Sequence, residues 1–153
     1  MVYKAVFFDF DNTLIQGNVW DSISKRLNCV EEDARLYRAF LNGEIDFGSW
    51  NKSIIELYKS KGLTREVFYE AVRSIKPVSN AKNVIDSLKN RGFITGIISG
   101  SIKNAYDFFR EEYDINVHFA RFAVELFFSV DGSLVRNNCV SDRRKHVRMH
   151  ARI

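Results

Sequence analysis

The chain has 153 residues, of which 46% are hydrophobic and 27% are charged, and its formal net charge is +4. This composition excludes a disordered tail and supplies enough apolar side chains for a folded core. The sequence shows no signal peptide and no apolar run of the ~20 residues that a membrane-spanning helix needs, and its two cysteines lack metal-like spacing, so we expect a cytoplasmic protein without membrane contact.

The positive charge is concentrated in one short stretch, where the basic residues are Arg143, Arg144, Lys145, Arg148 and Arg152. Nucleic-acid binding usually needs a basic face with aromatic side chains interleaved. Because the rest of the chain is nearly balanced in charge, we predict no nucleic-acid partner and interpret the stretch as a solvated helix.

The first predicted element is a strand over residues 2–8, apolar except for Lys4 and typical of a strand covered on both faces of a parallel sheet. It runs into D-F-D-N-T, which places Asp9 and Asp11 two residues apart. Ligands of such sheets bind beyond the carboxyl ends of the strands. There, one carboxylate can attack phosphorus and the other can transfer protons. The structural alternative is that both aspartates only end the strand and cap the next segment of the chain.

Four helices are predicted next, over residues 18–28, 31–41, 46–59 and 64–75. The third has the clearest apolar face, and Asp46 is placed to cap it. We interpret the aromatic residues Phe40, Trp50 and Phe68 as the core of a small bundle. The stretch 76–78 contains the only proline and ends the helical region.

A helix over residues 81–88, ended by Gly92, and a buried strand over residues 93–98 restore the alternation of strands and helices. The strand runs into Ser99-Gly100-Ser101, where the Ser99 hydroxyl and the Gly100 amide can donate to a phosphoryl oxygen. The same residues can instead simply cap the next helix, and the residues alone leave both interpretations open.

Beyond the helix that comes after Ser101, we predict a short strand over residues 117–120. A hairpin comes next, formed by residues 123–130 and 133–135 around Asp131-Gly132, because D-G between apolar runs is a strong turn signal. Asp131 is therefore interpreted as a turn residue.

These motifs together resemble the haloacid dehalogenase-like hydrolases, most of which are magnesium-dependent phosphatases with an aspartate nucleophile. D-F-D-N-T resembles the first motif of that superfamily, and I-I-S-G-S over residues 97–101 resembles the second. The helical insert, with Asp46-Phe47 and K-G-L-T over residues 61–64, resembles the cap of the phosphoserine-phosphatase-like branch. The resemblance implies an α/β fold with a Rossmann-like parallel sheet core over residues 1–15 and 79–153 and a helical cap over residues 16–78.

The resemblance also implies roles for individual residues. Asp9 would be the nucleophile and Asp11 the general acid and base, and both would hold Mg²⁺. Thr13 would help to hold the loop, Ser99 and Gly100 would bind the phosphate, and Lys145 is the best match to the charge-neutralising residue of the third motif. A solvated basic helix is the alternative for Lys145, because Arg143 and Arg144 stand beside it.

The sequence departs from the family pattern in two places. No Gly-Asp pair of the fourth motif comes after Lys145, and Asp142 is only a remote substitute, so we expect a truncated member with an uncovered sheet edge through which two copies could form a homodimer. In the phosphoserine-specific relatives, a glutamate after the first motif and an arginine on the cap bind the amino acid. The matching positions here are Asn18 and residues 52–54, where neither of these two charges is plainly kept.

The expected function is therefore magnesium-dependent hydrolysis of a small phosphorylated metabolite through an aspartyl phosphate. A catalytically impaired remnant that binds phosphate or a partner is the alternative. A phosphoacceptor signalling domain is disfavoured, because such domains carry the acceptor on a later strand and lack a long helical insert.

Overall fold

The computed structural model describes residues 4–139 of the chain and shows an α/β fold around a four-stranded sheet. The strand order is β1-β4-β5-β6, in which β1 (Ala5–Phe8), β4 (Ile94–Ile102) and β5 (Phe119–Phe128) are parallel and β6 (Leu134–Cys139) is antiparallel. The predicted fold class is confirmed. Two short strands, β2 (Ile15–Gln16) and β3 (Lys76–Pro77), pair separately, and neither was predicted because two residues carry no periodic pattern.

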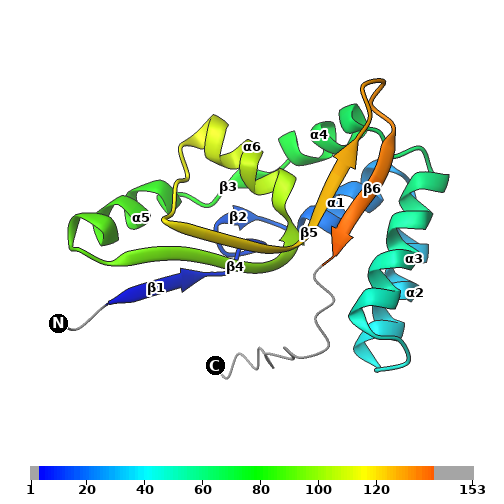
Figure 1. Cartoon of the computed structure of the whole chain (residues 1–153), viewed down its shortest axis with the longest axis horizontal. Helices are drawn as coiled ribbons and strands as arrows, with labels where there is room; N and C mark the ends of the chain where they lie inside the picture. The colour runs from blue at the N-terminus through cyan, green and yellow to red at the C-terminus, as the bar shows by residue number, and fades with distance from the viewer. Residues whose placement is uncertain (1–3, 140–153) are drawn as a thin grey trace.

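The helices form two groups (Figure 1). Helices α5 (Ala81–Asn90) and α6 (Lys103–Tyr113) lie along one face of the sheet. Helices α1 (Val19–Arg26), α2 (Val30–Leu41), α3 (Phe47–Ser60) and α4 (Arg65–Arg73) lie beyond the carboxyl ends of β1 and β4. All four predicted helices of this second group are confirmed. Within residues 4–139, no helix is both long enough and apolar enough to cross a membrane.

Local capping explains where three helices of the second group begin. The side chain of Asn18 accepts a hydrogen bond from the Trp20 amide at 2.8 Å and begins α1. Asp46 accepts from the Ser49 amide at 2.7 Å, as predicted, and Thr64 accepts from the Val67 amide at 3.3 Å. Each of these oxygens satisfies an amide that has no partner within the helix.

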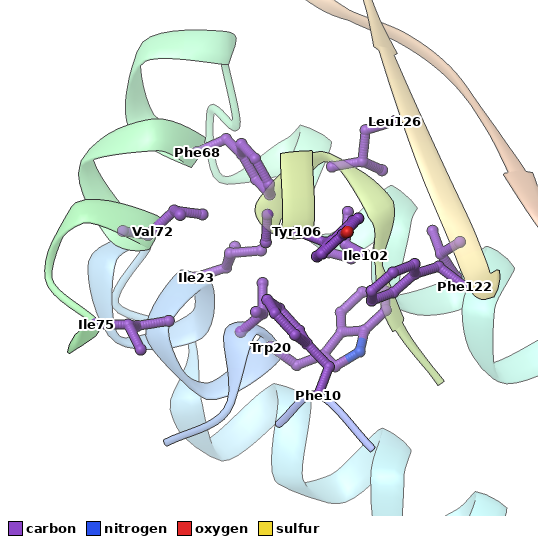
Figure 2. Packing of buried hydrophobic residues seen from close by; sticks show 14 of the residues in the cluster. Phe10, Trp20, Ile23, Phe68, Val72, Ile75, Ile102, Tyr106, Phe122 and Leu126 are labelled. Carbon is purple, nitrogen blue, oxygen red and sulfur yellow. The ribbon is translucent and has the colours of Figure 1, made fainter. Parts of the chain in front are cut away.

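Aromatic and aliphatic side chains pack together between the sheet and both groups of helices (Figure 2). Trp50 and Phe68 are buried as predicted, whereas Phe40 is only partly buried and packs against the core. The Trp20 ring lies 5.1 Å from that of Trp50. The same cluster of buried residues continues from these helices to the sheet, so the helices beyond the strand ends share one core with it.

The β5–β6 hairpin reaches from the sheet to the helices. The Arg65 amide donates to the Gly132 carbonyl at 2.8 Å, and the Asn137 amide group on β6 donates to Asn51 on α3 at 2.5 Å. The predicted turn is confirmed, since Asp131 accepts from the Ser133 amide at 3.0 Å. The predicted hairpin is confirmed by the antiparallel pairing of β5 with β6, but the predicted break between a strand over residues 117–120 and another over residues 123–130 is wrong, because β5 is unbroken over residues 119–128. Pairing with β4 on one side and β6 on the other joins the two apolar runs.

One face of the sheet and one edge are uncovered by the described residues. Phe7 is paired in register with Gly96, which is in turn paired with Phe119, and Phe7, Phe119, Ile94 and Ile98 are between 43% and 52% exposed. Among residues 4–139, no strand pairs with the outer edge of β1. Residues 4–139 therefore do not cover the first strand on both faces as predicted, because an apolar run along the chain does not reveal which elements pack on each face. Association of two copies through this edge stays a prediction.

A buried polar pair joins α2 to α3. The Tyr58 hydroxyl donates to the Asp33 carboxylate at 2.5 Å and lies 3.1 Å from the carbonyl oxygen of Trp20. Tyr58 is fully buried and Asp33 nearly so. Burial raises the pKa of Asp33, and the hydrogen bond from Tyr58 opposes that rise.

We predict that Tyr58→Phe destabilises the protein by about 1–3 kcal/mol, since the buried Asp33 loses its donor. The substitution raises the folded-state pKa of Asp33 further above its unfolded value, and stability is lost as the pH rises through a raised pKa. The loss should therefore be larger at pH 7.5 than at pH 4.5. Urea unfolding at the two pH values measures it, and an equal loss at both would contradict the account.

Candidate active site

Phe10 holds the loop that comes after β1. Its side chain is fully buried, and its ring makes edge-on contacts with Tyr106, Phe109 and Phe122 at centroid distances of 6.0, 5.8 and 5.4 Å. Figure 2 shows the ring of Phe10 within this buried group. The residues on either side of Phe10 are the two aspartates of the motif, so the aromatic contact places both at the end of the strand.

Backbone hydrogen bonds close the loop behind Phe10. The Phe10 carbonyl accepts from the Leu14 amide at 2.9 Å and from the Thr13 amide at 3.3 Å, and the Asn12 amide donates to the Gly17 carbonyl at 2.9 Å. Asn12 adopts a positive φ of 56°, which asparagine tolerates better than most residues. Thr13 is exposed within this turn, and its role in holding the loop stays a prediction.

The two aspartates have different environments. Asp9 is exposed, and its Oδ1 accepts a hydrogen bond from the Phe10 amide at 2.6 Å. Asp11 is partly buried, and its Oδ1 accepts from the amide of Val19, the first residue of α1, at 3.1 Å. Asp11 thus makes the kind of contact to the next segment that the structural alternative foresaw.

Burial raises the pKa of Asp11 to about 6, because the charged form loses hydration in this position. The hydrogen bond from Val19 and the Ser101 hydroxyl both act to lower that pKa, and the negative charges of Asp9 and Asp21 act to raise it. A carboxyl group with a pKa near neutrality can give and take a proton in the same reaction cycle.

Ser99, Gly100 and Ser101 lie within the carboxyl half of β4. Phe8 is aligned with Ile97, so the residues after Phe8 are level with the Ser-Gly-Ser segment on the neighbouring strand. Ser99 is buried, and its hydroxyl oxygen accepts from the Ser101 amide at 3.3 Å. The interpretation of these serines as caps of the next helix is wrong, because α6 begins after Ile102, which makes no side-chain cap.

Gly100 offers open space at the end of β4. A Cβ built there meets no atom of the described residues within 4 Å, so packing does not require glycine. The residue is exposed, and a ligand can approach its backbone closely.

The remaining predicted positions divide into two groups. Lys145 and the substitute Asp142 lie outside the described residues. Asn18 is described, and its side chain is used to cap α1 rather than to bind a ligand in this structure.

Within residues 4–139, no group of three or more His, Cys, Asp or Glu side chains is arranged to hold a metal ion, so Asp9 and Asp11 are the oxygen donors that this part of the chain offers at the strand end.

A polar cleft of about 850 Å³ opens beside the loop, between α1 and α4. Its described lining includes Asn12, Gly17 and Asn18 but neither aspartate of the motif. The cleft also contains the ion pair between Arg26 and Glu70. Because the reactive carboxylates lie outside it, we place the candidate site at the ends of β1 and β4 and not in this cleft.

Comparisons with a family model and with individual known proteins point to the same family. The family described as haloacid dehalogenase-like hydrolase matches residues 3–133. The phosphoserine phosphatase of Methanocaldococcus jannaschii is 27% identical over 139 residues, which cover 88% of this chain and 65% of that protein. The phosphoserine phosphatase of Streptococcus thermophilus is 30% identical over 116 residues, which cover 75% of this chain and 53% of that one.

Solved structures show the same likeness. A structure described as a phospho-aspartyl intermediate analogue of phosphoserine phosphatase superposes with a TM-score of 0.70 at 25% identity, covering 91% of this chain and 64% of that one. The phosphoserine phosphatase of T. onnurineus has a TM-score of 0.72 at 19% identity, covers 91% of this chain and 65% of that one, and shows the shared fold. The chain therefore spans about two thirds or less of the length of these relatives.

We predict that Asp11→Asn stabilises the metal-free protein at pH 8 by an amount on the order of 2 kcal/mol. The folded pKa of about 6 lies above the model value of 3.8, so the folded state loses stability as the pH rises through 6 and the carboxyl group ionises. Asparagine keeps an oxygen for the Val19 amide and carries no charge.

The gain in stability should largely vanish at pH 4. At that pH the Asp11 carboxyl group is mostly protonated in the folded protein, so its burial does not yet lower the stability that asparagine would restore. Thermal unfolding in the presence of a chelator at pH 4 and pH 8 measures the difference. A gain that is the same at both pH values would show that the charge of Asp11 is not its cause.

Proposed function

The chain belongs to the haloacid dehalogenase-like hydrolases, and on this basis we propose that it hydrolyses a small phosphomonoester through an aspartyl phosphate, with Mg²⁺ as cofactor. The observation that carries the proposal is the placement of Asp9 and Asp11 at the end of β1, level with Ser99 on the adjacent parallel strand. Ligands of parallel sheets bind at this end of the strands.

Asp9 is proposed as the nucleophile because its carboxylate is exposed and anchored at one oxygen by the Phe10 amide. The free oxygen attacks phosphorus, the bond from phosphorus to the ester oxygen breaks, and the phosphoryl group stays on Asp9. Asp11 gives its proton to the departing oxygen. In the second step Asp11 takes a proton from water, the resulting hydroxide attacks the same phosphorus, and the bond from phosphorus to the Asp9 oxygen breaks, which frees the Asp9 carboxylate and inorganic phosphate.

The phosphoryl oxygens are proposed to be bound by the Ser99 hydroxyl and the Gly100 amide, with Thr13 supporting the loop from the other side. Donors that are already in place at the strand end stabilise the charge that develops during transfer. Lys145 is proposed to neutralise part of that charge, as the resemblance implies.

The described residues fit Mg²⁺, which is usually held by one or two carboxylates together with water and substrate phosphate. Asp9 and Asp11 supply such oxygens, and a bound Mg²⁺ would neutralise charge on the phosphoryl group. Helices α1–α4 are proposed to act as a cap that excludes water from the site, with residues 16–78 as the cap and residues 1–15 and 79–153 as the core.

The proposed substrate class is a small phosphorylated metabolite, with the reaction taking place in the cytoplasm. The names of the relatives point to phosphoserine. However, Asn18 is used to cap α1, and Ile54, in the corresponding stretch of α3, is fully buried and apolar. We therefore propose the phosphomonoester class and not phosphoserine itself.

A second candidate function is a catalytically impaired protein that binds phosphate or a partner. It is favoured by the small number of metal-ligating side chains at the site within residues 4–139. The uncovered edge of β1 would then offer a place for a partner or a second copy. Turnover with Mg²⁺ separates the two candidates.

We predict that Asp9→Asn lowers magnesium-dependent hydrolysis of p-nitrophenyl phosphate by about a thousandfold or more, because a carboxamide is nearly isosteric but not nucleophilic. Steady-state release of p-nitrophenol measures the effect. Asp86→Asn, which alters an exposed carboxylate paired with Lys82, is the matched control and should keep full activity. Full turnover by Asp9→Asn would refute the proposed nucleophile.

Beryllium fluoride, which mimics a phosphoryl group on aspartate, should raise the melting temperature of the wild-type chain by a few degrees in the presence of Mg²⁺. A ligand that binds only the folded state stabilises it by mass action. Asp9→Asn should show no such shift. If the wild-type chain hydrolyses no ester but keeps the shift, the binding candidate replaces the enzymatic one.

A further inference from the structure

Helix α2 leaves most of its apolar side chains uncovered. It lies at the end of the molecule opposite β1 (Figure 1) and packs chiefly against α3 and α1. Asp33 is the buried residue of this helix, whereas Val30, Tyr37 and Leu41 are 47%, 46% and 62% exposed. Helices of a folded domain usually turn an apolar stripe toward the core, and α3 and α4 each bury several apolar residues. The apolar side of α2 is therefore open to a partner, as far as residues 4–139 show.

The uncovered residues form a continuous stripe along the helix. Val30, Ala34, Tyr37 and Leu41, here called the α2 stripe, follow one another at intervals of four, three and four residues. This is the spacing at which side chains line the seam between two paired helices. The Tyr37 ring is held by the Trp50 ring at a centroid distance of 6.1 Å, so it loses little freedom when a partner covers it.

Two opposite charges flank the α2 stripe on one side. Glu31 and Arg38 are both exposed, and because they are seven residues apart they lie two turns apart on the same side of the helix. Neither side chain forms an ion pair within the described part of the chain, whereas Glu32 pairs with Lys61 at 3.0 Å. Both charges are therefore free to pair across an interface.

The order of these charges makes α2 complementary to itself in one orientation. When two copies of the helix run antiparallel, the flanking positions on this side face each other, and Glu31 of each copy comes next to Arg38 of the other. A two-fold axis produces this pair twice. A parallel arrangement would instead set equal charges level with each other.

We propose that α2 is the interface between two copies of this chain, which pair antiparallel about a two-fold axis near the middle of the α2 stripe. Ala34 of one copy then lies against Tyr37 of the other, so a small side chain leaves room for a large one. The pairs of Glu31 with Arg38 close one rim of the interface. An interface formed by one 12-residue helix is smaller than that of a stable complex, so the dimer is weak and reversible. The inference does not depend on the proposed reaction.

Sedimentation velocity of the full chain at low ionic strength, over concentrations from about 10 to 500 μM, should show the average mass rise from 17.8 kDa toward twice that value. Glu31→Arg and Arg38→Glu should each weaken the dimer by about tenfold or more, because each replaces two attractive pairs by two repulsive ones. An equimolar mixture of the two single variants should recover association, since the mixed dimer has opposite charges at both pairs. The double variant should recover it for the same reason.

Arg73→Glu is the matched control, because it reverses the charge of an exposed arginine in the last turn of another helix, α4, and should leave the dimer unchanged. Leu41→Ser removes a side chain that is already 62% exposed, so it should keep the melting temperature and weaken the dimer. A chain that stays monomeric over the whole concentration range, or a mixture that associates no better than either single variant, would overturn the inference. A dimer that none of the α2 variants affects would also overturn it and would indicate association through the uncovered edge of β1.

Discussion

The contact of Phe10 with Tyr106, Phe109 and Phe122 connects the D-F-D-N-T loop to the rest of the molecule. The three partners come from α6 and β5, elements that are distant from Phe10 in the sequence. Because Phe10 stands between the two aspartates, burying its ring in this group sets the position of both. The positions of the two carboxylates therefore depend on the formation of the whole core and not on the loop alone.

The site also retains groups that oppose folding. Asp11 is an acid whose ionised form is disfavoured by burial, and Ser101 is a hydroxyl without a partner among the described residues. Stability alone would replace both by apolar or neutral side chains.

Two connections join the helices beyond the strand ends to the sheet. At one, the Val19 amide at the start of α1 donates to Asp11, so the helix group is attached directly to the reactive loop. At the other, the β5–β6 hairpin contacts the start of α4 through Arg65 and contacts α3 through Asn51. Motion of these helices would therefore alter the surroundings of Asp11. The sheet is less supported at β1, which pairs with one described neighbour.

Local sequence signals determined the features that depend on neighbouring residues. The cap at Asp46, the turn at Asp131 and the D-F-D-N-T motif at the end of the first strand were all readable, because each needs only a few adjacent residues. The tertiary structure alone decided that β1 is an edge strand among the described residues and that one strand covers residues 119–128. These features arise from strand pairing and from packing between distant segments, which a pattern along one chain does not encode.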